Sequence, residues 1–176
     1  MITFDHFKIA LLHPNESEPF FNLIENNRVR LEDFFAGIVS KTKTLEETIA
    51  YCKIIEERIQ NKNYLPYMIT DTKTNSFVGL VDVKNIDLNV PKGELGSFID
   101  SKYEGIGITT KATNLVVEHI VKEHKFIKLL CRANSRNKGS IAVILKSGFT
   151  LEGTIRNDYR TTRGEIVDLN YYGRVF

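Results

Sequence analysis

Two glycines, Gly105 and Gly107, stand immediately before a segment with the periodicity of a helix. From Ile108 onward, apolar residues recur every three or four positions, as they do on one buried helix face. The first N–H groups of a helix have no partner within it, and the helix dipole adds partial positive charge there. Such a loop can bind an anionic group, phosphate above all. The alternative is a plain tight turn, in which glycine only lets the backbone reverse.

Two common phosphate-binding motifs do not fit this loop. No Gly-Lys-Ser or Gly-Lys-Thr follows the glycines at the spacing used by nucleoside triphosphatases. The dinucleotide fingerprint requires a third glycine at the position where Thr110 stands. The sequence therefore predicts either an anion site of another kind or a turn.

Composition excludes several classes of function. With 176 residues, 42% of them hydrophobic and 26% charged, the chain fits one domain spanning residues 1–176. A net charge of +2 is too small to indicate a nucleic-acid partner, and no apolar run approaches the ~20 residues of a membrane span. Cys52 and Cys131 lack Cys-x-x-Cys spacing and no secretory signal is visible, which favours a reduced, cytoplasmic protein. The four histidines offer no metal framework.

Hydrophobic periodicity predicts seven strands and five helices. The strands are expected at 7–12, 64–70, 76–85, 94–100, 126–133, 149–156 and 166–176. The helices are expected to begin near Asn15, at 29, after Thr44, at 108 and after Asn137. Because a helix joins the 94–100 and 126–133 strands, that pair should be parallel within an otherwise mostly antiparallel sheet.

The order of these elements, together with three stretches, resembles the GCN5-related N-acetyltransferases (GNAT). The stretches are residues 94–99, 103–112 and 137–153. Within the superfamily the chain is most similar to the RimJ/RimL-type group, and the likeness covers essentially the whole chain. The resemblance implies a mixed α/β GNAT-like fold. Its seven-stranded, mostly antiparallel sheet would carry helices on both faces, and the parallel strands 4 and 5 would splay apart.

The activity implied by the resemblance is transfer of the acetyl group of acetyl-CoA to a primary amine by direct attack in a ternary complex. RimJ/RimL-type proteins acetylate ribosomal-protein N-termini, so the implied acceptor is the α-amino group of a protein. Two alternatives remain open, an enzyme for a small amine such as a polyamine or aminoglycoside, and a non-catalytic acyl-CoA-binding module. Neither a metal, nor nucleic acid, nor a membrane is implied, and fold analogy allows a homo-oligomer.

The resemblance also assigns residues to acetyl-CoA. The pantetheine amides would pair with the end of the fourth strand like an added strand, and the pyrophosphate would bind N–H groups of the glycine loop. The residues so implied are Phe98, Ile99, Asp100, Gly105, Ile106, Gly107, Ile108, Thr109, Thr110, Asn137, Ser140 and Lys146. Nearby cations that could contact the 3′-phosphate are Lys102, Lys111, Arg136 and Lys138.

Two loop residues depart from the family pattern. Glu104 stands where the family usually has Gln or Arg, and Thr109 where it has Gly or Ala. An acid beside a pyrophosphate is unfavourable unless its side chain points away. We therefore expect Glu104 to face solvent or a lysine.

Three residues are candidates for the reaction itself. Ser140 and Asn137 stand where RimL-type proteins place the proposed general acid and a pantetheine contact, although Asn137 also fits a helix N-cap with Ser140 at its N3 position. Glu94 is a candidate base or amine anchor, or else a solvent-facing residue at a strand start. A backbone N–H near Ile99 could stabilise the oxyanion. Weaker interpretations place Phe34 and Phe35 in a cleft wall, and Asp168 and Tyr171 in the acceptor pocket.

Overall fold

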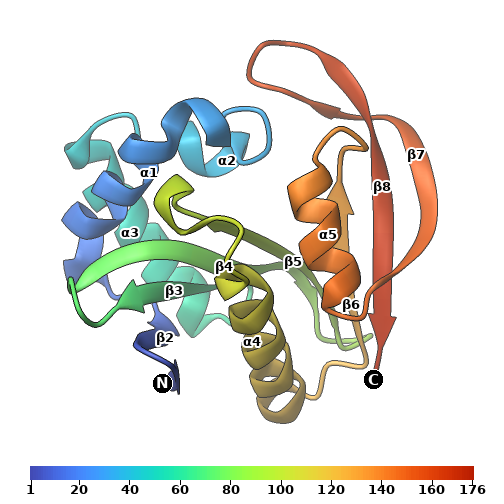
Figure 1. Ribbon diagram of the computed structural model, residues 1–176, viewed down its shortest axis with the longest axis horizontal. Coiled ribbons are helices and arrows are strands. Elements are labelled where there is room, and N and C mark those ends of the chain that lie inside the picture. Colours follow the sequence, from blue (N-terminus) through green and yellow to red (C-terminus); the bar gives the residue numbers. More distant parts are fainter.

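Eight strands form one continuous sheet in the order β1-β2-β3-β4-β5-β6-β8-β7 in the computed structural model, which describes residues Met1–Phe176 (Figure 1). The strands are β1 (Ile2–Phe4), β2 (Phe7–Leu11), β3 (Leu65–Asp71), β4 (Ser76–Asp87), β5 (Lys92–Ile99), β6 (Lys128–Ala133), β7 (Thr150–Arg160) and β8 (Ile166–Val175). The helices are α1 (Ser17–Leu31), α2 (Ala36–Val39), α3 (Leu45–Gln60), α4 (Ile108–His124) and α5 (Lys138–Lys146), with short 3-10 turns at Pro14–Glu16 and Ser101–Tyr103.

The predicted mixed, mostly antiparallel sheet is confirmed, but it has eight strands rather than seven. The additional strand is β1, which pairs with β2 across a two-residue turn so that Phe4 stands opposite Phe7. Asp5, in that turn, has a left-handed φ of 48°. Three residues are too few for an alternating pattern to appear in the sequence, because a strand is recognised over four to eight positions.

The parallel pair β5 and β6 diverges, as predicted for strands 4 and 5 before β1 is counted. Their ladder holds only three residue pairs, and the last of them joins Glu94 to Leu130. Beyond it, β5 stays paired with β4 as far as Ile99, while β6 stays paired with β8 as far as Ala133. Each strand follows its own antiparallel neighbour, so a gap opens between them.

Helices cover both faces of the sheet, as predicted. On one face Leu80 and Phe98 pack with buried residues of α1, α2 and α3. On the other face Leu95 and Ile99 pack with α4 and α5. The alternation along β5 follows from the two-residue side-chain period of a strand. In Figure 1, α1, α2 and α3 lie together, away from α4 and α5.

Two predicted helix boundaries are wrong. No separate helix covers 29–36, because α1 continues unbroken to Leu31 and α2 begins only at Ala36. The first helical cap is His13 rather than Asn15, since the His13 ring accepts from the Asn15 N–H and Glu16 accepts from the His13 N–H. Pro14 fits the first position of that turn, where an N–H is not needed. The caps at Thr44 and Asn137 are confirmed.

A buried asparagine joins α1 to the end of β5. Asn27 is 2% exposed, and its Nδ2 donates to the Leu23 carbonyl and to the Asp100 carboxylate at 3.0 and 2.9 Å. Its Oδ1 accepts from the Ser101 N–H at 3.2 Å. The amide therefore satisfies a buried carboxylate and fixes the chain at the point where β5 ends.

Replacing Asn27 with alanine should lower the free energy of unfolding by about 2–3 kcal/mol, because the Asp100 carboxylate loses a buried donor. Asn26→Ala is the matched control, since Asn26 is exposed on the same helix and should change stability by less than about 0.5 kcal/mol. Urea denaturation measures both. Equal losses in the two variants would show that the Asn27 contacts contribute nothing of their own.

Candidate active site

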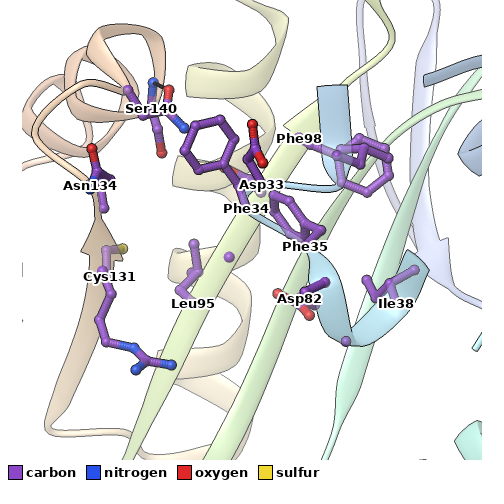
Figure 2. A pocket seen from close by; sticks show the side chains of 18 of the residues that line it. Asp33, Phe34, Phe35, Ile38, Asp82, Leu95, Phe98, Cys131, Asn134 and Ser140 are labelled. Carbon is purple, nitrogen blue, oxygen red and sulfur yellow. Dashed lines mark hydrogen bonds between the residues drawn. The ribbon is translucent and has the colours of Figure 1, made fainter. Parts of the chain in front are cut away.

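A cavity of about 1270 Å³ occupies the gap between β5 and β6 and extends to both faces of the sheet. Its walls come mainly from the end of α1, the segment between α1 and α3, β4, β5, β6 and α5, and further residues come from α3, α4, β7 and β8. Figure 2 shows side chains from these elements converging on it, with Ser140 and Asn134 on one side and Phe35 and Asp82 on the other. The gap predicted between the parallel strands is therefore open space.

The glycine loop presents unpaired N–H groups. Gly105 and Gly107 have φ values of 77° and 85°, a left-handed conformation that glycine adopts without strain. The first main-chain hydrogen bond of α4 runs from the Lys111 N–H to the Gly107 carbonyl, at 3.1 Å. None of the five N–H groups from Ile106 to Thr110 donates to an acceptor in the protein. Five free donors at a helix N-terminus are suited to bind an anionic group.

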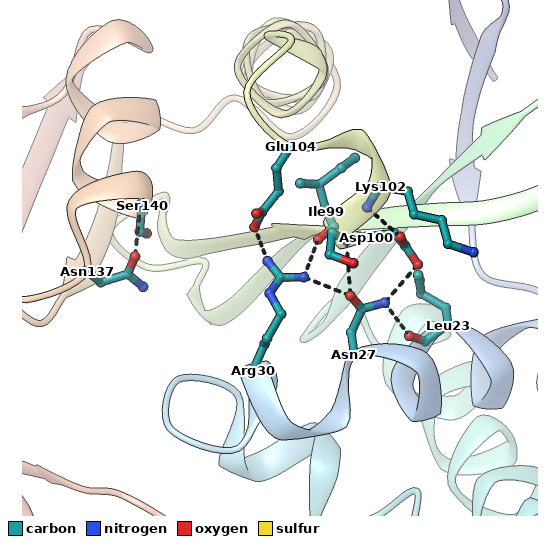
Figure 3. Close-up of polar contacts among 10 residues, drawn as sticks. Leu23, Asn27, Arg30, Ile99, Asp100, Lys102, Glu104, Asn137 and Ser140 are labelled. Carbon is teal, nitrogen blue, oxygen red and sulfur yellow. Dashed lines mark hydrogen bonds and ion pairs between the residues drawn. The ribbon is translucent and has the colours of Figure 1, made fainter.

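The acidic residue of this loop is turned away from those donors. The Glu104 carboxylate forms an ion pair with Arg30 of α1 (Figure 3). Arg30 also donates to Asn27 Oδ1 at 2.8 Å and to the Ile99 carbonyl at 3.5 Å. The expected partner of Glu104 was solvent or a lysine, and the partner found is an arginine from a distant helix. Its negative charge is neutralised on the side of α1.

Asn137 and Ser140 meet at the start of α5. Asn137 Oδ1 accepts from the Ser140 N–H at 3.0 Å, which makes Asn137 the N-cap. Both residues also line the cavity, and neither Asn137 Nδ2 nor Ser140 Oγ donates to a protein acceptor (Figure 3). The cap and a role in the cavity are therefore compatible. Asn137 contributes a free amide N–H and Ser140 a free hydroxyl.

Glu94 is buried, so the interpretation as a solvent-facing residue is wrong. Its carboxylate lies 3.0 Å from Arg132 Nε and 3.6 Å from Lys84 Nζ. It also accepts from Asn85 Nδ2 at 2.8 Å. Burial opposes the charge of Arg132, but the Glu94 carboxylate and the Tyr171 hydroxyl together outweigh burial and raise the pKa of the guanidinium. A carboxylate engaged by three groups suits an ion-pair network better than proton abstraction.

Comparison with known proteins decides the family. The family model described as an acetyltransferase (GNAT) domain matches residues 8–150. This chain belongs to the GNAT acetyltransferase family. It is 31% identical over 170 residues to YdaF of Bacillus subtilis (strain 168), provisionally named a ribosomal N-acetyltransferase, and the match covers 96% of this chain and 90% of YdaF.

Two further GNAT proteins extend the comparison. The ribosomal-protein-serine acetyltransferase of Escherichia coli (strain K12) is 21% identical to this chain over 163 residues. The match covers 92% of this chain and 88% of the E. coli protein. A solved structure of RimL, a ribosomal L7/L12 α-N-protein acetyltransferase in complex with coenzyme A, superposes with a TM-score of 0.90 at 18% identity. That superposition covers 98% of this chain and 96% of RimL, and it confirms the GNAT fold.

Only some of the residues predicted from the sequence line the cavity in the gap between β5 and β6. The predicted residues that line it are Glu94, Phe98, Ile99, Gly105, Thr109, Arg136, Asn137 and Ser140. Phe34 and Phe35 also line it, in accordance with the cleft-wall interpretation. Ile106, Gly107, Ile108 and Thr110 do not line it, although their N–H groups belong to the loop described above.

Other predicted residues lie elsewhere. Asp100 turns toward Asn27, and Lys146 lies at the far end of α5 in a separate depression with Arg174. Asp168 and Tyr171 do not line the cavity, and the Tyr171 hydroxyl donates to Asp158 at 2.7 Å. Of the four expected 3′-phosphate cations, Lys102, Lys111 and Lys138 do not line the cavity, whereas Arg136 does, and Lys111 and Arg136 form ion pairs with Asp5 and Glu165. No helix is long and apolar enough to cross a membrane, and no cluster of metal-binding side chains occurs.

Sequence reasoning missed Asp82, which lines the cavity from β4 and is 2% exposed. Its Oδ2 accepts from the Tyr64 hydroxyl at 3.0 Å, whereas its Oδ1 has no partner. Its carboxylate is the main reason that the pKa of Lys84 is raised. The available signal was an acid inside the apolar run of residues 77–83, since an unpaired charge is rare in a central strand.

The two cysteines should be unreactive in the native protein. Burial raises the pKa of the Cys131 thiol far above its ordinary value, and burial also raises the pKa of Cys52. Both thiols are therefore protonated at pH 8, and the thiolate is the reactive form. An aromatic disulfide reagent at pH 8 should react at least about a hundredfold more slowly with the native than with the denatured protein. Rapid modification of either native thiol would contradict the burial of these two side chains.

Proposed function

We propose that residues 1–176 form a single acetyltransferase domain that binds acetyl-CoA and transfers its acetyl group to a primary amine, in particular the α-amino group of a protein. The observation that carries the proposal is the row of five free N–H groups from Ile106 to Thr110 at the entrance to the β5–β6 gap. An anionic head with a narrow, amide-bearing arm fits both features at once. Acetyl-CoA has this form.

The cofactor would bind in two parts. Its pyrophosphate would accept from the loop N–H groups, with the dipole of α4 adding attraction. Its pantetheine arm would follow the open edge of β5 from Asp100 past Ile99 and Phe98, where no strand supplies hydrogen bonds on that side. Asn137 and Ser140 offer donors from the opposite wall. The complex of RimL with coenzyme A supports this assignment, since the two chains share the fold.

The reaction would proceed by attack of a neutral amine on the thioester carbon. The C–N bond forms, the oxyanion accepts from a backbone N–H near Ile99, and the C–S bond then breaks. The departing thiolate takes the proton of a donor, for which the free hydroxyl of Ser140 in the cavity wall is our candidate, and the proton that the nitrogen loses as the amide forms restores that hydroxyl. An α-amino group has an ordinary pKa of about 8, so it needs little help to lose its own proton near neutral pH.

The charge of the cavity favours a protein N-terminus over a polycationic small amine. Its lining contains seven Lys or Arg residues and five Asp or Glu residues. A polyamine or an aminoglycoside would meet this positive excess unfavourably. The names of YdaF and of the E. coli ribosomal-protein-serine acetyltransferase point to the same class of acceptor.

Acetyl-CoA should stabilise the protein against heat. At a hundredfold excess over its dissociation constant it adds about 2.7 kcal/mol, which corresponds to a rise of about 5–10 °C in Tm for a chain of this length. Coenzyme A should act similarly and NAD should not. The absence of a shift with either acetyl-CoA or coenzyme A would mean that the glycine loop is only a turn, and the proposal would fall.

Ser140→Ala should lower kcat about a hundredfold, because the proton donor is lost, while most of the thermal shift with acetyl-CoA remains, because the loop N–H groups, the edge of β5 and Asn137 still bind the cofactor. The helix cap remains, since Asn137 supplies it. Ser76→Ala, an exposed serine at the far end of β4, is the control and should retain full activity. If acetyl-CoA binds tightly but no amine in a panel of peptides and polyamines is acetylated by the unmodified protein, the binding-module alternative is correct.

A further inference from the structure

The cavity has a second polar part on the α1–α3 face of the sheet, which the proposed path of acetyl-CoA does not use. Asp82 and Lys84 project into it from β4, and their register partners on β5 are Gly96 and Glu94. Residues two apart on a strand share a face, so the two charged side chains stand next to each other. Phe35, from the segment before α2, lies close to Asp82 in Figure 2, and Lys84 Nζ is 5.9 Å from the centre of its ring.

The Asp82 carboxylate lacks a donor. The Tyr64 hydroxyl donates to one carboxylate oxygen at 3.0 Å. The second oxygen has no protein partner, although Asp82 is only 2% exposed. Lys84 does not supply the missing donor, because its ion pair is with Glu94, at 3.6 Å. A buried carboxylate oxygen without a partner is costly, so a ligand with N–H groups would be bound strongly there.

Gly96 lets this carboxylate reach the cavity wall. A Cβ atom at position 96 would lie 2.5 Å from Asp82 Oδ1, 3.4 Å from Lys84 Nζ and 3.6 Å from the edge of the Phe35 ring. Any side chain there would push the carboxylate aside. Because Gly96 has no side chain, the Asp82 carboxylate, the Lys84 ammonium group and the edge of the Phe35 ring can lie close together beside it.

That point lies beside the proposed reacting centre. The last residue pair of the β5–β6 ladder joins Glu94 to Leu130, and Gly96 is two residues farther along β5. A pantetheine arm that enters at the loop and follows β5 back from Ile99 would bring its thioester to the end of the gap, where β5 and β6 become paired. An amine bound at Asp82 would approach the thioester from the α1–α3 face, opposite the face from which α4 and α5 line the gap.

We propose, on the basis of the function proposed above, that Asp82 and Lys84 together recognise the acceptor. Asp82 Oδ1 accepts from the acceptor amine, and Lys84 Nζ donates to the carbonyl oxygen of the same residue. The pair therefore selects an α-amino group followed by a carbonyl, as at a peptide N-terminus. A polyamine offers Lys84 only another cation, so it lacks half of the recognition.

The test compares three acceptors by steady-state kinetics with acetyl-CoA in excess. These are short peptides with free α-amino groups and different first residues, a primary alkylamine without a carbonyl, and spermidine. The unmodified protein should prefer a peptide. Asp82→Asn keeps an acceptor for Tyr64 but removes the charge, and it should lower kcat/KM for peptides at least about tenfold, through KM for the acceptor. KM for acetyl-CoA should not change.

Lys84→Met separates the two halves of the site, since methionine keeps the length of the side chain but cannot donate. It should lower kcat/KM for peptides about tenfold more than it lowers that for the alkylamine, because only the peptide also loses a hydrogen bond from its carbonyl oxygen. Asp71→Asn is the matched control. Asp71 is another buried aspartate that accepts from a tyrosine hydroxyl, at 2.9 Å from Tyr103, but it does not line the cavity. Its variant should keep the KM for peptides of the unmodified protein.

Several results would overturn the inference while leaving acetyl transfer intact. They are unchanged peptide kinetics in Asp82→Asn, faster acetylation of spermidine than of any peptide, or equal losses for peptide and alkylamine in Lys84→Met. If Asp82→Asn does not fold, Gly96→Ala replaces it, because its Cβ displaces the same carboxylate and must cause the same acceptor-specific loss. Failure of the proposed function is distinct, since the unmodified protein would then acetylate no amine at all.

Discussion

The divergence of β5 from β6 after Glu94 is the constraint on which the rest of the structure depends. Two parallel strands that stayed paired would leave neither a cavity nor an open edge. Each strand is instead held by an antiparallel neighbour, β4 through Ile99 and β8 through Ala133. Hydrogen bonds within each half of the sheet therefore keep the gap open. The gap is built into the register of the sheet and does not require a ligand to form it.

The end of β5 must also be fixed, because the glycine loop begins only a few residues later. Asn27 holds Asp100 and the Ser101 N–H, while Arg30 contacts the Ile99 carbonyl and Glu104. Helix α1 thus sets the position of the loop from outside the sheet. The same contacts turn the one acidic charge of the loop toward α1, so the free N–H groups present an uninterrupted positive end. The side chains that stabilise the end of β5 therefore also orient the free N–H groups of the loop.

Local features of the site could be predicted from the sequence. The glycine loop, the Asn137 cap and the change from strand to helix periodicity each depend on residues that are close together in the sequence. Contacts between distant segments could not be predicted. Arg30 and Glu104 are 74 residues apart, and Asp82 meets Gly96 only because of the β4–β5 register. A register is fixed by the packing of two whole strands, and a shift of one residue would turn Asp82 to the other face.

The charge pattern around Asp82 also bears on how the amine loses its proton. A lone carboxylate would hold the acceptor as an ammonium ion and slow its attack, since an opposite charge favours the charged form. Lys84 opposes this effect. Its pKa is raised, chiefly by Asp82, so it stays charged at neutral pH beside the bound amine. The field of the Asp82 carboxylate at the acceptor is therefore partly cancelled by Lys84. The α-amino group of the acceptor can then release its proton near its ordinary pKa of about 8. In the proposed site a dedicated buried base is then unnecessary, which agrees with Glu94 being engaged by Arg132, Lys84 and Asn85.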